Sequence, residues 1–439
     1  MKTIFAVALI PLTLAITPLS MAGTTPKASA TIMFYLDNQN GDYVDSYIKN
    51  QLEVIKNLSQ KNNTVRWVTL HEKGSALSTG QRSLDIKDQN LTVNEWINGS
   101  EVLLADIKVE QKNLRPSFSN PEVLKYFLEK GLSLGSKHNI LVMADHGVGS
   151  YGLMTTSLTE NGKALNEVMS NREAAAAIAG AMKNTHAQID LIIFDACLMA
   201  NIEAVTDYRK AGLEMPVVAS EDTTTPTSGS LNYEKTIGAL AKELEKGRLF
   251  DSLLFGAMIV KQSKNNNAIN ISLINLKVLT DDILNKLSHL FADLTTDLKE
   301  PDKNKVYSEF LEARIVDDKT MGVDNEVDLR TYLEMLQKIK VLSKEVKESA
   351  LELETALFSK TVAPDNSKLV VVSENDQSDV TSEKGLSIVH PIKPDMHEAE
   401  TVKFFINDCK HSESLLFSSL TGWTEVLKAY VEFKTCDGQ

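Results

Sequence analysis

Short apolar runs alternate with helical segments along the first half of this chain. The runs that read as buried strands lie at residues 31–36, 65–70, 140–144, 189–194 and 216–219, and helical patterns cover 44–58, 121–131 and 173–183. Strands that read as continuous apolar runs are buried on both faces, and helices between them carry the chain from one parallel strand to the next. The pattern predicts a mostly parallel sheet with helices on both faces.

The second half of the chain, from about residue 231, is mostly helical. Helical patterns cover 240–260 and 279–298, and short strands are predicted at 270–274, 369–372 and 386–389. The basic, asparagine-rich stretch 261–267 is a candidate linker between two halves, although a surface loop within one domain explains it equally well. We predict a sheet-containing domain at 23–262 and a mixed, largely helical α/β region at 263–439 that packs on it.

The N-terminus has the pattern of an export signal. Lys2 is followed by an apolar run at residues 4–16, and Ser20-Met21-Ala22 offers a cleavage site. The run is shorter than the roughly 20 residues that span a bilayer. A buried amphipathic helix is the alternative reading. We predict a signal peptide at 1–22 and a secreted or periplasmic protein without a membrane anchor.

The charge and the cysteine count exclude several classes of protein. The 439 residues carry a formal charge of −13, which argues against a nucleic-acid-binding protein. With 3 cysteines the chain is neither a disulfide-dense scaffold nor a four-cysteine zinc protein. No pair of histidines or cysteines has zinc-ligand spacing, so we predict no metal site. An acidic enzyme with a sizeable core fits these limits.

Two chemically reactive side chains follow neighbouring apolar runs. Asp145-His146-Gly147 comes after the run at 140–144, and Asp195-Ala196-Cys197 comes after the run at 189–194. Parallel strands bring such residues to one edge of a sheet. A thiol beside an imidazole becomes a nucleophile for acyl transfer, and the backbone N–H groups of Gly147 and Cys197 could bind an oxyanion.

Less reactive roles are also consistent with these residues. A single cysteine in an apolar segment is often a small buried hydrophobic residue, so Cys197 need not be a nucleophile. His71 competes with His146 for the role of base, because it also follows an apolar run and precedes Glu72. The sequence alone leaves both alternatives open.

The two strand ends resemble a known family. An apolar strand ending in His-Gly, followed about fifty residues later by one ending in Asp-Ala-Cys, is the pattern of the clan CD cysteine peptidases. Residues 192–200 (Ile-Ile-Phe-Asp-Ala-Cys-Leu-Met-Ala) resemble the cysteine block of clostripain and its bacterial relatives. Further similarity lies in 34–38, 217–221, 228–233, 327–329 and 385–391, so the resemblance runs from about residue 31 into the C-terminal region.

The resemblance implies a fold, an activity and a set of site residues. It implies a caspase-like αβα sandwich with a helical C-terminal half, and an exported cysteine endopeptidase that uses a Cys197–His146 dyad on protein or peptide substrates. It also places Asp195 near the pocket for the residue before the scissile bond, which is Arg or Lys in relatives. Glu221 and Asp222 could add negative charge to that pocket. A threonine-rich loop at 223–227 departs from the usual Pro-Gly turn, so the preferred residue is less well specified than the chemistry.

The resemblance carries three further expectations. Relatives cut their own chain between the two catalytic blocks, and here Lys163 precedes Ala164 in a polar segment beside an Asn-Gly turn. Residues 155–166 are expected to form an irregular surface loop, with a plain hairpin as the alternative. No cofactor is required, although some relatives use Ca²⁺. A secreted caspase-like scaffold that binds without turnover is the alternative function.

The cysteine positions give an independent expectation. An oxidising compartment favours a disulfide, and Cys409 and Cys436 both lie near the C-terminus, whereas Cys197 lies far from them. A Cys409–Cys436 bridge would leave Cys197 as a thiol. The alternative is that these two cysteines stay unpaired. We expect the protein to act as a monomer.

Overall fold

The structure of this chain is a computed structural model. It describes residues 28–38, 43–72, 84–85, 90–107, 115–160, 163–221, 231–246, 250–263, 270–299, 326–359, 364–375, 384–389 and 416–430. The predicted signal peptide, Asp222, Cys409 and Cys436 lie outside these residues. Within the described residues, no helix is both long enough and apolar enough to cross a membrane.

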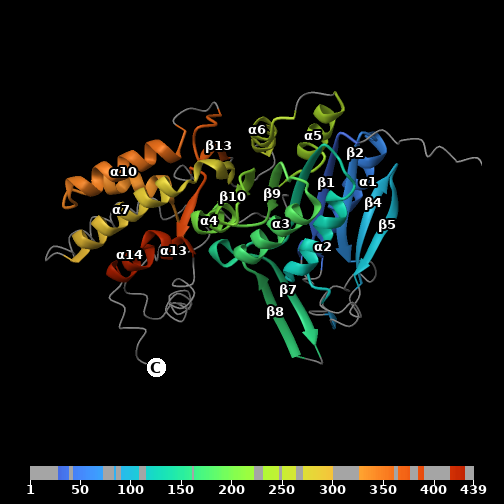
Figure 1. Cartoon of the computed structure of the whole chain (residues 1–439), viewed down its shortest axis with the longest axis horizontal. Coiled ribbons are helices and arrows are strands. Elements are labelled where there is room, and N and C mark those ends of the chain that lie inside the picture. The colour runs from blue at the N-terminus through green and yellow to red at the C-terminus, as the bar shows by residue number, and fades with distance from the viewer. Residues whose placement is uncertain are drawn as a thin grey trace, which may run out of the picture.

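A nine-stranded sheet organises the described part of the chain, in the order β13-β11-β10-β9-β6-β1-β2-β4-β5 (Figure 1). Its five middle strands run parallel. They are Ala30–Leu36 (β1), Val65–Glu72 (β2), His138–Ala144 (β6), Leu191–Asp195 (β9) and Pro216–Ser220 (β10). Antiparallel strands flank them: Leu91–Ile97 (β4) and Ser100–Ile107 (β5) beyond β2, and Asn270–Asn275 (β11) and Val370–Asn375 (β13) beyond β10.

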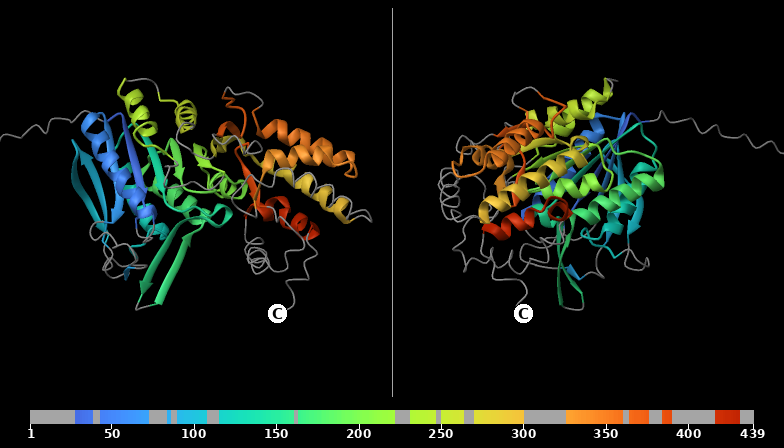
Figure 2. Two further views of the ribbon diagram at one scale, coloured as in Figure 1. Left: turned by 180° about the vertical axis from the view of Figure 1, so that it is seen from behind. Right: turned by 60° about the vertical axis from the view of Figure 1, so that its left-hand side comes forward.

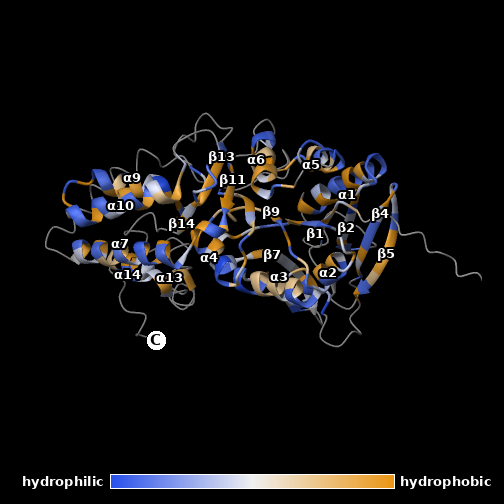
Figure 3. Cartoon of the chain, turned by 45° about the horizontal axis from the view of Figure 1, so that its top comes forward, coloured by the Kyte–Doolittle hydropathy of each residue, from blue (hydrophilic) through white to orange (hydrophobic). Residues whose placement is uncertain are grey.

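Helices cover both faces of this sheet because its strands are apolar on both sides. Alternate residues of β1 enter different cores: Met33 and Tyr35 pack on one face, and Ile32 and Phe34 on the other. The first face holds Pro121–Leu132 (α2), Asn171–Thr185 (α3) and Ile202–Lys210 (α4); the second holds Tyr43–Lys61 (α1), Thr236–Glu245 (α5) and Ser252–Ser263 (α6). Figure 3 shows the helices striped with hydrophobic and hydrophilic residues, as this packing requires.

The C-terminal helices gather at one end of the molecule, opposite β4 and β5 (Figure 2). They are Asp281–Lys299 (α7), Leu329–Lys338 (α9), Lys344–Leu357 (α10), Leu416–Thr421 (α13) and Trp423–Tyr430 (α14). Trp423 is 1% exposed and packs on Phe291 and Tyr332. Two short strands, Glu326–Asp328 (β12) and Ser387–Val389 (β14), pair with each other outside the main sheet.

Two β-hairpins extend from this framework. Asn98 and Gly99 join β4 to β5, with φ of 52° and 76°, the left-handed conformation that a two-residue hairpin turn requires. The second hairpin consists of Leu153–Glu160 (β7) and Lys163–Met169 (β8), and Leu84–Asp85 (β3) pairs with β7. It projects away from the sheet in Figure 1.

The predicted fold class is confirmed: a mostly parallel sheet lies between helical layers, with a largely helical C-terminal half. Strands β11 and β13 come from that half and extend the same sheet. Two local predictions were wrong. Residues 240–260 form α5 and α6 rather than one helix, since Asp251 Oδ1 accepts bonds from the N–H groups of Leu253 and Leu254 and starts a new helix. Residues 155–166 lie mostly in the paired strands β7 and β8, so the structure has the hairpin given as the alternative rather than an irregular loop.

Candidate active site

The register of the sheet places His146 beside Cys197. Ala144 of β6 lies opposite Asp195 of β9, and the N–H of Asp145 donates to the carbonyl of Asp195 at 3.3 Å. His146 and Cys197 each come two residues after this pair, so the two parallel strands deliver them to the same edge at the same height. Both side chains are partly exposed, whereas their neighbours in sequence are largely buried.

Gly147 brings the two loops into close contact. A Cβ atom on Gly147 would lie 2.0 Å from the carbonyl oxygen of Cys197 and 3.0 Å from its nitrogen. No larger residue fits without moving one of the loops. Gly147 also forms a β-bridge with Leu153, and the N–H of Met154 donates to the carbonyl of His146 at 3.2 Å. These contacts hold the His146 loop against β7, and the absence of a side chain at Gly147 lets the same loop approach the Cys197 backbone.

The loop that carries Cys197 has a tight backbone. Leu198, directly after Cys197, has φ of 62°, a left-handed conformation that is uncommon outside glycine. The N–H of Ala200 donates to the carbonyl of Ser220 at 2.7 Å, which ties the loop to the end of β10. Asn201 then caps α4 by accepting a bond from the N–H of Ala204 at 3.1 Å. The chain therefore turns sharply directly after Cys197, at Leu198, and α4 starts at Ile202, five residues after Cys197.

His71 lies away from these loops. It belongs to β2, which β6 and β1 separate from β9 in the sheet. Its Nε2 lies 3.1 Å from the carboxylate of Glu101 on β5, and its Nδ1 lies 3.2 Å from the hydroxyl of Thr69. The structure thus places His146, and not the competing His71, next to Cys197.

Acidic side chains mark the carboxyl ends of all five parallel strands. They are Asp37 after β1, Glu72 at the end of β2, Asp145 after β6, Asp195 at the end of β9 and Glu221 after β10. Burial, followed by the charge of the Asp45 carboxylate, raises the pKa of Glu72 to about 7. Of these carboxyl groups, those of Asp145 and Asp195 are nearest in sequence to His146 and Cys197, one and two residues before them.

Of the three predicted pocket residues, Asp195 and Glu221 lie among the described residues, and their carboxylates have different hydrogen-bond partners. Asp195 is 4% exposed and its Oδ2 accepts a hydrogen bond from the hydroxyl of Tyr47 at 2.6 Å. Glu221 is fully buried, and its Oε2 accepts bonds from Asn270 Nδ2 at 2.8 Å and from the N–H of Gly385 at 2.7 Å. Glu221 thus points toward a C-terminal segment, while Asp195 stays next to the Cys197 loop.

The predicted cleavage site lies at the tip of the β7–β8 hairpin. Lys163 is the exposed first residue of β8 and pairs with Glu160, and Ala164 pairs with Thr159. The second basic residue of this segment, Arg172, lies in the first turn of α3, 3.9 Å from the carboxylate of Asp207. The two candidate bonds therefore differ in backbone conformation: one is strand, the other helix.

Two residues at this site were missed in the sequence analysis. Tyr47 reaches Asp195 from α1, and Glu326 reaches the loop after His146 from β12. No local pattern marks either one, because each meets its partner across more than a hundred residues of sequence. The similarity at 327–329, directly after Glu326, was the available signal. Among the described residues no cluster of three or more His, Cys, Asp or Glu could hold a metal ion.

Comparisons with known proteins identify the family. The sequence model of the clostripain family matches residues 35–430. A secreted C11 cysteine protease from Bacteroides thetaiotaomicron, solved with an irreversible peptide inhibitor, is 15% identical with a TM-score of 0.55, over 90% of this chain and 99% of that one. An inactive zymogen C11 protease from Parabacteroides distasonis is 16% identical with a TM-score of 0.57, over 90% and 98%. No curated protein matches the chain in sequence. The fold of the two solved proteins is the fold described above, and the family match over most of the length shows that this chain belongs to the clostripain family of cysteine peptidases.

Proposed function

We propose that this peptidase is exported and cleaves peptide bonds through Cys197 and His146. The observation that carries the proposal is the register of β6 and β9, which sets both residues at one height on the sheet edge. In this mechanism the Cys197 thiolate attacks the peptide carbonyl, and His146 gives its proton to the leaving amine. Water then attacks the thioester and releases the second product. The N–H groups of Gly147 and Cys197 hold the oxyanion.

We further propose that the enzyme cleaves after Arg or Lys. The carboxyl groups at the ends of β6 and β9, next to the two reactive residues, support this preference, because a guanidinium or ammonium group that leaves water needs a paired carboxylate. Asp195 is the best placed of them, two residues before Cys197. Asp222 follows Glu221 outside the described residues and is proposed as a second contributor. No cofactor is part of this mechanism, and Ca²⁺ dependence remains a proposal without assigned ligands.

One experiment tests both the thiol chemistry and the preference. Purified protein is treated with thiol-directed acyl-type probes that carry Arg, Lys, Asn, Asp or Leu before the reactive carbonyl. We expect covalent labelling of Cys197 by the Arg and Lys probes, at least about tenfold faster than by the others, since a buried charge pair discriminates strongly. Preference for Asn, Asp or Leu would contradict the acidic pocket. No labelling by any probe would favour the scaffold that binds without turnover.

Self-cleavage between Lys163 and Ala164 is the third part of the proposed function. Lys163 is exposed at the tip of a hairpin, beside the turn, and exposed loop tips are where proteolytic nicking concentrates. The solved relative from Parabacteroides distasonis is described as an inactive zymogen, which supports maturation of this protein by cleavage of its chain. Arg172 is the weaker candidate because its backbone is helical and a peptidase binds extended chain.

N-terminal sequencing of the wild type beside Cys197→Ala tests this cleavage. We expect termini at Gly23, from signal removal, and at Ala164 in the wild type, and a single chain beginning at Gly23 in the variant. Lys163→Ala serves as the matched control and is expected to stay uncut at this bond while its dyad remains intact. Full activity from a chain that is never cut would contradict the need for processing, and a terminus after Arg172 would move the site.

A further inference from the structure

The small sheet formed by β12 and β14 lies directly on the segment that follows Cys197. The N–H of Ser387 in β14 donates to the carbonyl of Ala200 at 2.8 Å, and Ser387 forms a parallel bridge with Asn201. Because Ala200 also bonds to the end of β10, the Cys197 loop is held from two sides. A C-terminal segment thus contacts the chain three to four residues after Cys197.

Glu326 of β12 is the acidic side chain at this contact. Glu326 is 6% exposed, and the hydroxyl of Ser387 donates to its Oε2 at 2.5 Å. The same hydroxyl accepts a weaker bond from Asn201 Nδ2 at 3.4 Å. A hydrogen bond from a hydroxyl to an ionised carboxylate is shorter and stronger than one between two neutral groups. Glu326 is therefore fixed to the loop of Cys197 through one intervening serine.

Glu326 also touches the loop that follows His146. A Cβ on Gly149 would lie 2.4 Å from Glu326 Oε1 and 3.6 Å from Leu198 Cβ, so the carboxylate packs on the Gly149 backbone. Gly149 has φ of 58°, and Asn171 Nδ2 donates to its carbonyl at 2.9 Å. One buried side chain thus contacts the loop after His146 directly and the Cys197 loop through Ser387.

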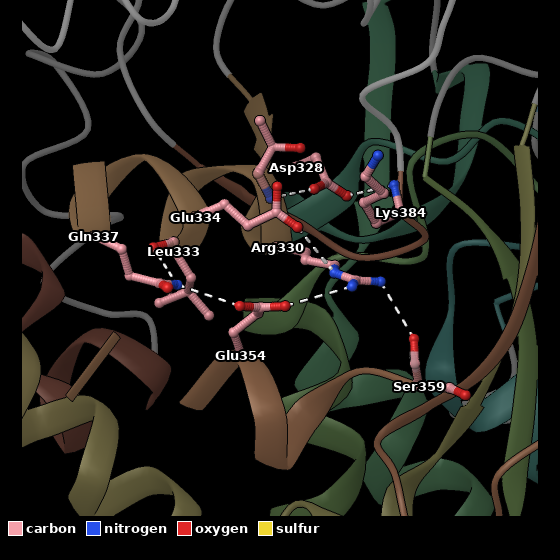
Figure 4. Close-up of polar contacts among 9 residues, drawn as sticks. Asp328, Arg330, Leu333, Glu334, Gln337, Glu354, Ser359 and Lys384 are labelled. Atoms are coloured by element: carbon pink, nitrogen blue, oxygen red, sulfur yellow. Dashed lines mark hydrogen bonds and ion pairs between the residues drawn. The ribbon is translucent and has the colours of Figure 1, made fainter. Parts of the chain in front are cut away.

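Hydrogen bonds and an ion pair at the C-terminal end of β12 hold this strand, and therefore Glu326, in place. Figure 4 shows Asp328, which caps α9 and accepts a bond from the N–H of Lys384 at 2.7 Å. Two residues later, Arg330 donates to the carbonyl of Ser359 at 3.2 Å and pairs with Glu354 at 3.4 Å. The strand is therefore tied to the C-terminal helices on one side and to the catalytic loops on the other.

We propose that Glu326 is a positioning residue for peptide hydrolysis, acting through Ser387 and Gly149 on the geometry of Cys197 and His146. The inference rests on the proposed function, because it assumes that these two residues carry the reaction. The physical reason is that a displacement of about 1 Å between reacting groups can cost about 100-fold in rate. Because Glu326 is buried, we expect its effect to fall on kcat rather than on KM.

The test compares Glu326→Ala, Ser387→Ala, the double variant and Glu326→Gln. For each protein, kcat is calculated from the concentration of active sites, which is measured by titration with the labelling probe. We expect each single alanine variant to lower kcat by about 10- to 100-fold with KM changed less than about twofold. The double variant should be no slower than the worse single one, because both remove the same contact. Glu326→Gln should recover most of the lost rate, since its amide oxygen accepts the Ser387 hydroxyl.

Glu352→Ala is the matched control, because Glu352 is an exposed C-terminal glutamate that pairs with Lys286 far from the site. It should leave kcat unchanged. If Glu326→Ala does not fold, the kcat of Ser387→Ala tests the inference instead, because this substitution removes a single oxygen atom. A kcat within twofold of wild type, or additive losses in the double variant, overturns the inference. Activity that survives Cys197→Ala instead overturns the proposed function, so the two failures are distinguishable.

Discussion

Cys197→Ala is expected to remove peptide hydrolysis, lowering kcat/KM by at least about 1000-fold. The side chain that attacks the carbonyl is lost, and neither the oxyanion contacts nor substrate binding can replace it. His146→Ala should cause a loss of similar size, because the leaving amine then departs without a proton. The two effects should not add, since both residues act in one step. Steady-state kinetics on a peptide with Arg before the scissile bond measures them.

His71→Ala is the control that separates the two candidate histidines. His71 pairs with Glu101 on β5 and lies three strands away from β9, so its loss should lower thermal stability and leave kcat near the wild-type value. An inactive His71→Ala beside an active His146→Ala would show that the base is misassigned. Full activity of Cys197→Ala would remove the proposed mechanism altogether.

Gly147→Ala is expected to be the most damaging substitution outside the dyad. The added Cβ would lie 2.0 Å from the Cys197 carbonyl oxygen. Because this oxygen belongs to the backbone, it cannot rotate away from the clash as the end of a flexible side chain could. The loops must separate, which should cost about 1–3 kcal/mol of stability, as overpacking does. A shift of about 1 Å at Cys197 should lower kcat about 100-fold. Thermal unfolding and kinetics on the same preparation measure both effects.

Gly180→Ala is the matched control for that substitution. Gly180 lies within α3, and an added Cβ would meet Lys125 Cε at 3.5 Å, an ordinary van der Waals contact. Alanine is the better helix former by about 1 kcal/mol, so stability should rise and kcat stay unchanged. If Gly147→Ala also kept wild-type kcat, the close approach of the two loops would have no role in catalysis.

The sequence determined the strands, helices and strand ends of the parallel core. The strands at 140–144 and 191–194 are buried on both faces, and their consecutive apolar residues indicate this burial in the sequence. His146 and Cys197 could be found because each follows such a run directly. The β4–β5 hairpin is also marked in the sequence, by Asn98-Gly99, the dipeptide typical of a two-residue hairpin turn.

Only the tertiary structure decided how the distant segments complete the site. β12 and β14 are three residues each, too short to show a periodic pattern, and Ser387 meets Ala200 across 187 positions of sequence. Glu221 illustrates the same limit: its sequence context suggested a pocket, whereas its carboxylate is buried against Gly385. Local sequence encodes local burial and turn geometry. Which buried polar groups satisfy one another depends on long-range packing, and so the fold alone brings Glu326 to the loops of His146 and Cys197.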